Sequence, residues 1–382
     1  MLTWLRGRIR FDRNELAGSF GDIGTDLPLL VGMVLAVGLD GASTFIVFGA
    51  MQILMGLVYG LPMPVQPLKA MAVIVISQKI APNVLYGGGL AIGLLMLALT
   101  VTGLLTRLAD FIPRSVVRGL QLGLGLNLAT LALKSYVPAD GAGGLVLAAV
   151  AFCVTIALLG NRKYPAALVI VLLGAAYTAV FHLNWTGLGQ SVGLAWPQPH
   201  VPTTADVLEG FWVLALPQLA LSIGNSVIAT RQTIHDLYPE HPVTIRRIGL
   251  TYALMNLVQP FVSGVPTCHG AGGLVGHYAF GGRTGGSVVI YGSAYLLVGL
   301  LFSQGLGEAI KVFPLPILGI ILLFEGLGLM AFVREVAPSK QDLTVCLLVA
   351  LAAVGLPQGY LIGLVAGTLL AILIRRGLVL RG

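Results

Sequence analysis

The sequence has little charge for its length. Of its 382 residues, 10% are Asp, Glu, Lys or Arg and 57% are hydrophobic, and the mean hydropathy is +0.92. This composition excludes an ordinary water-soluble domain, because water cannot be the main solvent of such a surface. The formal charge of +7 does not indicate nucleic-acid binding, because the basic residues are scattered over short loops and form no single face.

Cysteines are also few. Cys153, Cys268 and Cys346 lie in or beside apolar stretches without paired spacing, which argues against a disulfide framework and against a thiolate metal site. We expect Cys153 and Cys346 to be buried apolar side chains. The sequence contains no Walker-type phosphate loop, so we expect neither an ATP site nor any other cofactor or metal.

Long apolar runs fill the chain instead. They are long enough to cross about 30 Å of hydrocarbon and continue from residue 16 to residue 375, which predicts an all-α membrane protein. Breaks at Gly, Pro and charged residues separate the segments. Seven lie near residues 16–38, 41–60, 66–80, 84–106, 114–134, 143–160 and 164–182. Seven more lie near residues 211–230, 245–263, 268–281, 287–305, 311–332, 342–355 and 359–375.

An odd number of crossings in each half gives the halves opposite orientations, as in two inverted repeats. We therefore predict a first repeat over residues 1–182, an external linker over 183–210, which contains no Lys or Arg, and a second repeat over 211–382. Most basic residues then lie at cytoplasmic ends, and the exceptions are Lys69, Lys79, Lys134 and Lys311. The cytoplasmic set is Arg6, Arg8, Arg10, Arg13, Arg107, Arg114, Arg118, Arg162, Lys163, Arg231, Arg246, Arg247, Arg283, Arg334, Lys340, Arg375, Arg376 and Arg381.

The same distribution of basic residues predicts a multi-pass protein of the inner (plasma) membrane with both termini in the cytoplasm.

A weak internal repeat supports the division into halves. Phe111-Ile-Pro113 and Phe313-Pro314 each open the fifth segment of their half and are followed by Gly and Leu. Chance similarity between Gly/Leu-rich membrane helices is the alternative explanation.

The third segment of each half is short and follows proline-rich backbone. Such a matched pair of interrupted segments is a good sequence indicator of a transporter binding site. In the first half, Gly60-Leu-Pro62-Met-Pro64-Val-Gln66-Pro67-Leu-Lys69 cannot be helical through its prolines, but Pro67 suits the first turn of a helix. In the second half, Val265-Pro266-Thr267-Cys268-His269-Gly270 precedes a run of small residues that opens another helix.

Because the repeats are inverted, we expect these two half-helices to point their N-termini at each other near mid-membrane. Each N-terminus presents unpaired N–H groups and a partial positive charge, so an anion is the expected ligand. Gln66, Thr267 and His269 can donate hydrogen bonds to a tetrahedral oxyanion, and Gly270 lets the backbone approach it closely. The alternative for His269 is a packing role.

Lys69 can add a full positive charge to this site. The alternative is that Lys69 pairs with a buried carboxylate such as Asp22, because a lone lysine inside a membrane is costly. Asp22 and Asp26 are candidates for proton coupling or ion pairing, and Asp22 can instead cap a helix or hold Gly-rich backbone. For Glu325 we favour a structural or interface role.

The eighth segment mirrors the first and carries a polar stripe. Gln218, Ser222 and Asn225 recur at helical spacing and can face the site. A stripe that holds helices together explains them about as well.

Three motifs resemble those of the molybdate transporter family of the MOT type, a branch of the sulfate permease superfamily. They are Glu15-Leu-Ala-Gly18-Ser-Phe-Gly21-Asp22-Ile-Gly24-Thr25, Pro62-Met-Pro64-Val-Gln66-Pro67-Leu-Lys69, and Val265-Pro266-Thr-Cys268-His269-Gly270-Ala-Gly272-Gly273 with Phe280-Gly-Gly-Arg283-Thr-Gly285 downstream. The resemblance covers essentially the whole chain, and the second and third motifs are long and specific.

The resemblance implies a seven-plus-seven inverted-repeat fold with a core domain that moves against a gate domain like an elevator. The core would hold segments 16–106 and 211–305, and the gate segments 114–182 and 311–375. It also implies that Gln66, Lys69, Cys268, His269 and Gly270 line the substrate site. A homodimer is left open.

The expected function is secondary active transport of molybdate, with protons as a candidate coupling ion and no enzyme activity. Sulfate is the alternative substrate, because both ions are divalent tetrahedral oxyanions. An anion channel of the same fold is a second alternative. A nucleobase permease would need aromatic and carboxylate groups around a planar ring, and a membrane enzyme using Cys268 and His269 is disfavoured because adjacent helical positions do not face each other.

Overall fold

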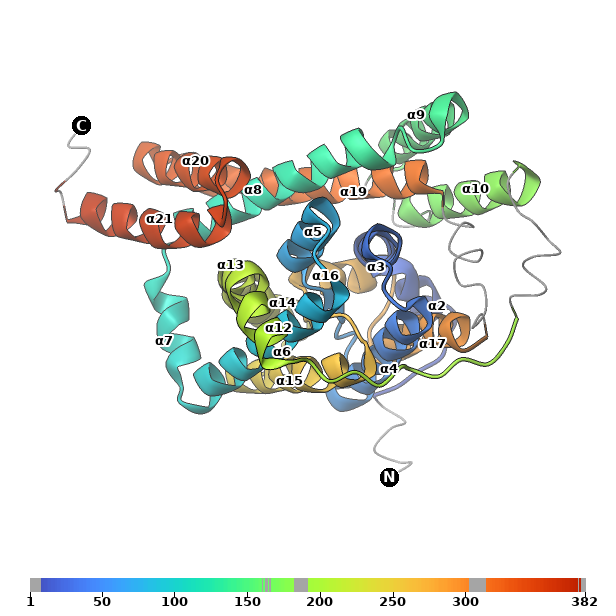
Figure 1. Cartoon of the computed structure of the whole chain (residues 1–382), viewed down its shortest axis with the longest axis horizontal. Coiled ribbons are helices and arrows are strands. Elements are labelled where there is room, and N and C mark those ends of the chain that lie inside the picture. Colours follow the sequence, from blue (N-terminus) through green and yellow to red (C-terminus); the bar gives the residue numbers. More distant parts are fainter. Residues whose placement is uncertain are drawn as a thin grey trace.

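The computed structural model of the chain is almost entirely helical (Figure 1). It describes residues 8–159, 161, 164, 166–181, 192–301, 314–376 and 378, with the backbone alone for residues 109 and 110. Short 3-10 or π-helical stretches are labelled η. The first half contains α2 (Arg13–Ser19), η1 (Phe20–Asp22), α3 (Ile23–Val37), α4 (Gly41–Tyr59), α5 (Lys69–Gln78), α6 (Pro82–Val101), α7 (Leu104–Phe111), α8 (Arg114–Leu131), η2 (Ala132–Tyr136), α9 (Gly141–Ala157) and α10 (Ala166–Phe181). The second half contains α12 (Thr204–Gly210), η3 (Phe211–Ala215), α13 (Leu216–Leu221), η4 (Ser222–Ala229), α14 (Thr230–Leu237), α15 (Ile245–Val258), η5 (Gln259–Val262), α16 (Ala271–Ala279), α17 (Gly286–Leu301), α19 (Leu315–Met330), η6 (Ala331–Glu335), α20 (Lys340–Gly355) and α21 (Gly359–Arg375).

Within the described residues, each apolar segment expected from the sequence overlaps one or more of these helices. In this part of the chain, six continuous helical stretches are long and apolar enough to cross a bilayer, and shorter apolar helices accompany them. The chain is therefore a multi-pass membrane protein. The eighth segment begins at Thr204 rather than near residue 211, because Thr203 and Asp206 form a reciprocal capping box that starts the helix inside the expected linker.

The structure differs from the sequence expectation at one of the cysteines. Cys346 is buried as expected, but Cys153 is exposed on α9, where an apolar side chain can contact lipid instead of the core. The predicted cytoplasmic residues Arg6, Arg162, Lys163 and Arg381, the exception Lys311, and Phe313 of the internal repeat lie outside the described residues.

The helices form two bodies (Figure 1). One is a layer of α8, α9, α10, α19, α20 and α21, and the other contains α2–α6 and α12–α17. Packing within them repeats between the halves. Helix α4 packs on α17 as α15 packs on α6, and α8 packs on α20 as α19 packs on α9. This pairing is what an approximate two-fold axis between inverted repeats produces.

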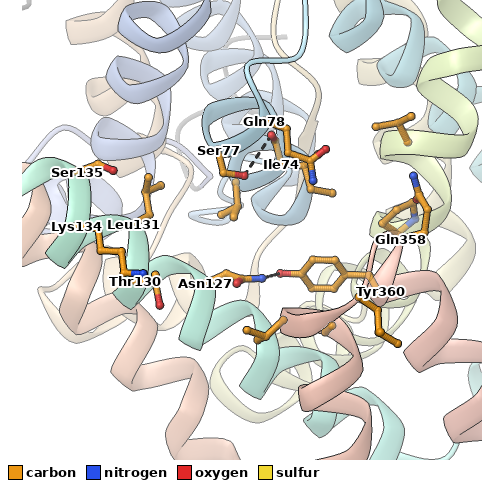
Figure 2. A pocket seen from close by; sticks show the side chains of 17 residues that line it. Ile74, Ser77, Gln78, Asn127, Thr130, Leu131, Lys134, Ser135, Gln358 and Tyr360 are labelled. Carbon is orange, nitrogen blue, oxygen red and sulfur yellow. Dashed lines mark hydrogen bonds between the residues drawn. The ribbon is translucent and has the colours of Figure 1, made fainter.

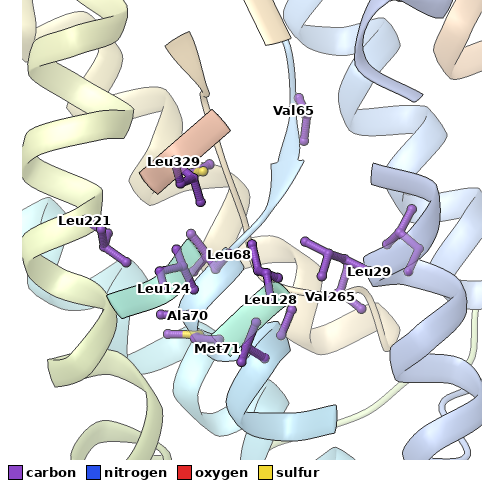
Figure 3. Packing of buried hydrophobic residues seen from close by; sticks show 14 of the residues in the cluster. Leu29, Val65, Leu68, Ala70, Met71, Leu124, Leu128, Leu221, Val265 and Leu329 are labelled. Atoms are coloured by element: carbon purple, nitrogen blue, oxygen red, sulfur yellow. The ribbon is translucent and has the colours of Figure 1, made fainter. Parts of the chain in front are cut away.

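Two short extended stretches cross at the centre of the second body. Strand β1 (Gln66–Pro67) pairs in antiparallel fashion with β2 (Thr267–Cys268), and Gln66 lies opposite Cys268. Helix α5 begins two residues after β1, and α16 begins three residues after β2. Figure 3 shows how apolar side chains such as Val65, Leu68 and Val265 pack around the crossing. The expected half-helices, each preceded by extended backbone, are thus present.

Buried amide side chains satisfy the extended backbone, which has no helical hydrogen bonds of its own. Gln52 of α4 donates to the Val65 carbonyl at 2.8 Å and accepts from the Val65 N–H at 3.2 Å. Asn256 of α15 makes the same pair of bonds to Thr267, at 2.6 and 3.0 Å. Because unpaired backbone groups are costly in a membrane, these two amides allow the helices to be interrupted there.

The first and third sequence motifs lie against each other. Glu15 is buried, and its carboxylate accepts hydrogen bonds from the N–H groups of Arg283, Thr284 and Ser287 at 2.9–3.0 Å. Nearby, a Cβ atom at Gly21 would overlap the backbone of Gly276 and His277. The glycines of these motifs therefore let η1 and α16 pack backbone to backbone.

We predict that Gly21→Ala destabilises the protein, because no flexible side chain can move out of the way of the new methyl group. The expected cost is about 1–3 kcal/mol, the usual range for overpacking. Gly328→Ala on α19 is the control, since a Cβ there meets nothing within 4 Å. Thermal unfolding in detergent should show a lower Tm for Gly21→Ala alone, and equal Tm values would contradict the packing described.

Candidate functional site

A small cavity with both polar and apolar walls lies where the two half-helices begin, between the two bodies. Its walls include Lys69 at the start of α5, Cys268 of β2, and Gln218 and Asn225 of the eighth segment. The structure thus brings together four residues that the sequence singled out. The cavity measures about 10 Å³, which is room for a single water molecule.

Lys69 forms an ion pair with Glu325 of α19. Its partner is thus not Asp22, the carboxylate named from the sequence. Asp22 instead accepts a hydrogen bond from the Gln66 amide at 2.6 Å. Glu325 also accepts a hydrogen bond from Thr25 of α3 at 3.2 Å, so this carboxylate touches two helices of the other body. Its expected role at an interface agrees with this position.

The start of α5 is capped by a side chain. Gln218 accepts hydrogen bonds from the N–H groups of Ala70 and Met71, at 3.0 and 3.4 Å. Ser222 lies behind Gln218, accepts from its amide at 3.2 Å and is 2.7 Å from the Tyr252 hydroxyl. Some of the N–H groups expected to be open to an anion are therefore occupied, and Lys69 supplies the positive charge at this end.

Gln66 and Asp22 pack against the start of α16, as Gln218 packs against the start of α5. Both side chains are buried, and a Cβ at Gly270 would overlap the Gln66 amide. A Cβ at Gly273 would overlap the Asp22 carboxylate. Glycines at these positions therefore let Gln66 and Asp22 lie directly against the first turn of α16.

Thr267 and His269 face away from the cavity. The ring nitrogens of His269 lie 2.8 Å from the Thr251 hydroxyl and 3.1 Å from the Pro64 carbonyl, and the ring packs edge-on against Tyr59. The Thr267 hydroxyl accepts a hydrogen bond from Gln259 at 2.8 Å. Because successive side chains of an extended stretch point to opposite sides, Cys268 faces the cavity and its two neighbours do not.

Asp26 occupies a closed environment deeper in the same body. Neither carboxylate oxygen makes a hydrogen bond of normal geometry within the described part of the chain, although the Tyr291 hydroxyl is close by. The Tyr291 and Tyr295 hydroxyls are 3.0 Å apart. A buried carboxylate without a charged partner is costly to ionise in a membrane, which distinguishes Asp26 from the paired Glu325.

Two larger cavities flank the small one. The first, of about 350 Å³, lies between α5, α8 and the α20–α21 turn and includes Ser77, Asn127, Lys134 and Tyr360 (Figure 2). The second, of about 530 Å³, lies between η1, α16, α19, the end of α9 and the start of α10, and includes Asp22, Thr25 and Glu325. The inverted repeat exchanges these two sets of elements, so the two cavities occupy equivalent positions in the two halves.

Sequence reasoning missed two polar residues of the small cavity, Gln121 and Ser226. Ser226 is one helical turn beyond Ser222, so the polar stripe of the eighth segment contained the necessary signal. Gln121 lies on α8, in the other body, and nothing in its local sequence indicates that it lines the same cavity as Lys69.

A family model described as molybdate transporter of MFS superfamily matches residues 14–128 and 210–329, more than half of the chain. Molybdate transporter 1 of Arabidopsis thaliana is 33% identical over 94% of this chain and 88% of its own length. The chain belongs to the molybdate transporter family. Arabidopsis molybdate transporter 2 is 31% identical over 96% of this chain and 90% of its own length. Because these relatives are named transporters, the family is not one of enzymes.

Solved structures show the same fold at low sequence identity. The murine anion transporter Slc26a9 in its inward-facing state superposes with a TM-score of 0.70 at 14% identity, covering 98% of this chain and 70% of that one. The transmembrane domain of the cyanobacterial bicarbonate transporter BicA gives 0.66 at 17% identity, covering 94% of this chain and 98% of that domain. This chain therefore has the seven-plus-seven inverted-repeat fold of SLC26 transporters, although the name of the matching family refers to the MFS superfamily.

We predict that Gln218→Ala lowers the stability of this protein, because the buried N–H groups of Ala70 and Met71 lose their acceptor. Leaving such donors unpaired costs about 1–3 kcal/mol. The control is Gln232→Ala on the same long helical stretch, where the side chain is exposed and bonds Asp236. Urea or thermal unfolding should separate the two variants. If both unfold like the wild type, Gln218 does not cap α5.

Proposed function

We propose that this protein is a secondary active transporter that carries molybdate across the inner (plasma) membrane. The observation that supports this most is the buried lysine at the start of a half-helix, facing Cys268 across a cavity between two bodies. A cation held there attracts a small anion. A neutral substrate would not be attracted by the charge, and a larger substrate would fit the small cavity less well. The names of the family and of the Arabidopsis relatives supply molybdate as the anion.

In the proposed complex, the oxyanion lies beside Lys69, Cys268 and Gly270. The rest of the cavity wall includes Gln218, Asn225 and Gln121. Gln66 holds Asp22 against the first turn of α16. Thr267 and His269 position β2 through their hydrogen bonds to Gln259, Thr251 and Pro64. Cavity volume must increase before the anion fits, so binding accompanies movement between the bodies.

The proposed movement is that of an elevator. The body that contains α2–α6 and α12–α17 is the core, and the layer of α8–α10 and α19–α21 is the gate. The two flanking cavities support this proposal, because each lies between core and gate. Since the repeats are inverted, equivalent cavities in the two halves would face opposite sides of the membrane. Sliding of the core would join the binding site to one cavity and then to the other.

Protons are the proposed coupling ion. Asp26 is fully buried beside Tyr291, and Asp22 lies at the wall of the larger cavity, so the core can hold a proton near the oxyanion. A proton carried with a divalent anion reduces the negative charge that crosses the membrane. A proton gradient across the membrane could then drive transport without an ATP site.

Sulfate transport and an anion channel remain the alternatives. Titration with both oxyanions distinguishes the substrates, and single-channel currents in liposomes would identify a channel.

We predict that purified protein binds molybdate and that Lys69→Ala or Gln66→Ala weakens binding at least tenfold, about 1.4 kcal/mol. Lys69→Ala removes the cation, and Gln66→Ala releases Asp22 toward the anion. Lys134→Ala is the matched control, because this lysine is exposed in the other cavity. Isothermal titration with molybdate, tungstate and sulfate measures the effect. Equal affinities in all four proteins would refute this site.

We also predict that Asp26→Asn abolishes accumulation driven by a pH gradient while molybdate exchange continues. An asparagine cannot take up and release a proton, whereas the binding site itself is unchanged. Proteoliposomes with and without an imposed pH gradient separate the two activities. Accumulation equal to that of the wild type would exclude Asp26 as the coupling group.

A further inference from the structure

The Lys69–Glu325 ion pair connects the two bodies. Lys69 is on α5, and Glu325 is in the middle of α19, on the opposite side of the boundary. Thr25 of α3 adds a second hydrogen bond to the same carboxylate. Any sliding of one body against the other must therefore break or rearrange these contacts.

The same pair separates two cavities. Lys69 forms part of the wall of the small cavity of about 10 Å³, whereas Glu325 forms part of the wall of the larger cavity of about 530 Å³. Leu329, one helical turn after Glu325, closes the small cavity from the same face of α19. A tetrahedral oxyanion of several atoms cannot lie beside Lys69 while these side chains keep their positions.

The charges around Lys69 also indicate that a carboxylate must move away before an oxyanion can bind. The Lys69 side chain is 10% exposed, so it needs a negative partner in the membrane interior, and Glu325 provides one. Asp22 is also nearby, so a divalent anion arriving at Lys69 would meet two carboxylates, those of Glu325 and Asp22, and a single lysine. Glu325 is the carboxylate that can leave most easily, because its side chain is 24% exposed in the larger cavity and can be hydrated there.

We propose that Glu325 is an internal competitor of the transported oxyanion. In the anion-free protein its carboxylate neutralises Lys69 and ties α5 to α19. The oxyanion takes over Lys69, Glu325 moves into the larger cavity, and the contact between the bodies is released. This inference rests on the proposed function, and it makes Glu325 a positioning residue that couples substrate binding to movement.

The test is molybdate binding to full-length Glu325→Gln in detergent, measured by isothermal titration. The amide keeps the size of the side chain but removes the competing charge. We expect molybdate to bind about fivefold more tightly or better than in the wild type. A purely structural role would not raise affinity. Glu335→Gln is the matched control, because Glu335 also pairs with cations, Arg114 and Arg118 at 2.6 Å, but lies away from the cavities. Its affinity should equal that of the wild type.

Glu325→Asp provides a second variant if the glutamine protein does not fold. Its shorter side chain withdraws the carboxylate from Lys69, so affinity should again rise, by less. If the wild type binds molybdate and the folded Glu325 variants bind it equally or more weakly, the competitor role is overturned and the proposed function stands. If the wild type does not bind molybdate at all, the proposed function fails and the inference fails with it.

Discussion

Antiparallel pairing of Gln66–Pro67 with Thr267–Cys268 is the contact on which the rest of the structure depends. The strands come from opposite halves of the chain, so their pairing joins the two repeats at the centre of one body. Gln52 and Asn256 satisfy the neighbouring backbone on each side. Since the pairing fixes where α5 and α16 begin, it also fixes the position of Lys69 between the two bodies.

A lysine in that position imposes a charge requirement on everything around it. An unpaired ammonium group inside a membrane is costly, so some anion must always accompany Lys69. In the structure this partner is Glu325 of the other body. In our account the oxyanion replaces it during transport. The same requirement links binding to movement, because exchanging one anion for the other changes the contacts between the two bodies. A fold shared with Slc26a9 and BicA supplies the scaffold on which this exchange operates.

The sequence predicted the architecture well and the side-chain contacts less well. Proline in Pro62–Pro67 and at Pro266 excludes helix, so both half-helices were predictable from local chemistry. The partner of Lys69 was not, because Glu325 follows 256 residues later on a helix whose facing side depends on tertiary packing. The orientation of His269 was accessible in principle: strand alternation places it opposite to Cys268. The cap of α5 by Gln218 required knowing that the eighth segment packs on the start of α5.

The most direct measurement is a crystal structure of the protein soaked in molybdate, with data collected at the molybdenum absorption edge. The anomalous signal locates the metal of the oxyanion without reference to any side-chain placement. We expect one strong peak within reach of the Lys69 ammonium and Cys268, with the Glu325 carboxylate turned toward the larger cavity. A peak elsewhere, such as beside Lys134, with the Lys69–Glu325 pair intact would contradict this expectation.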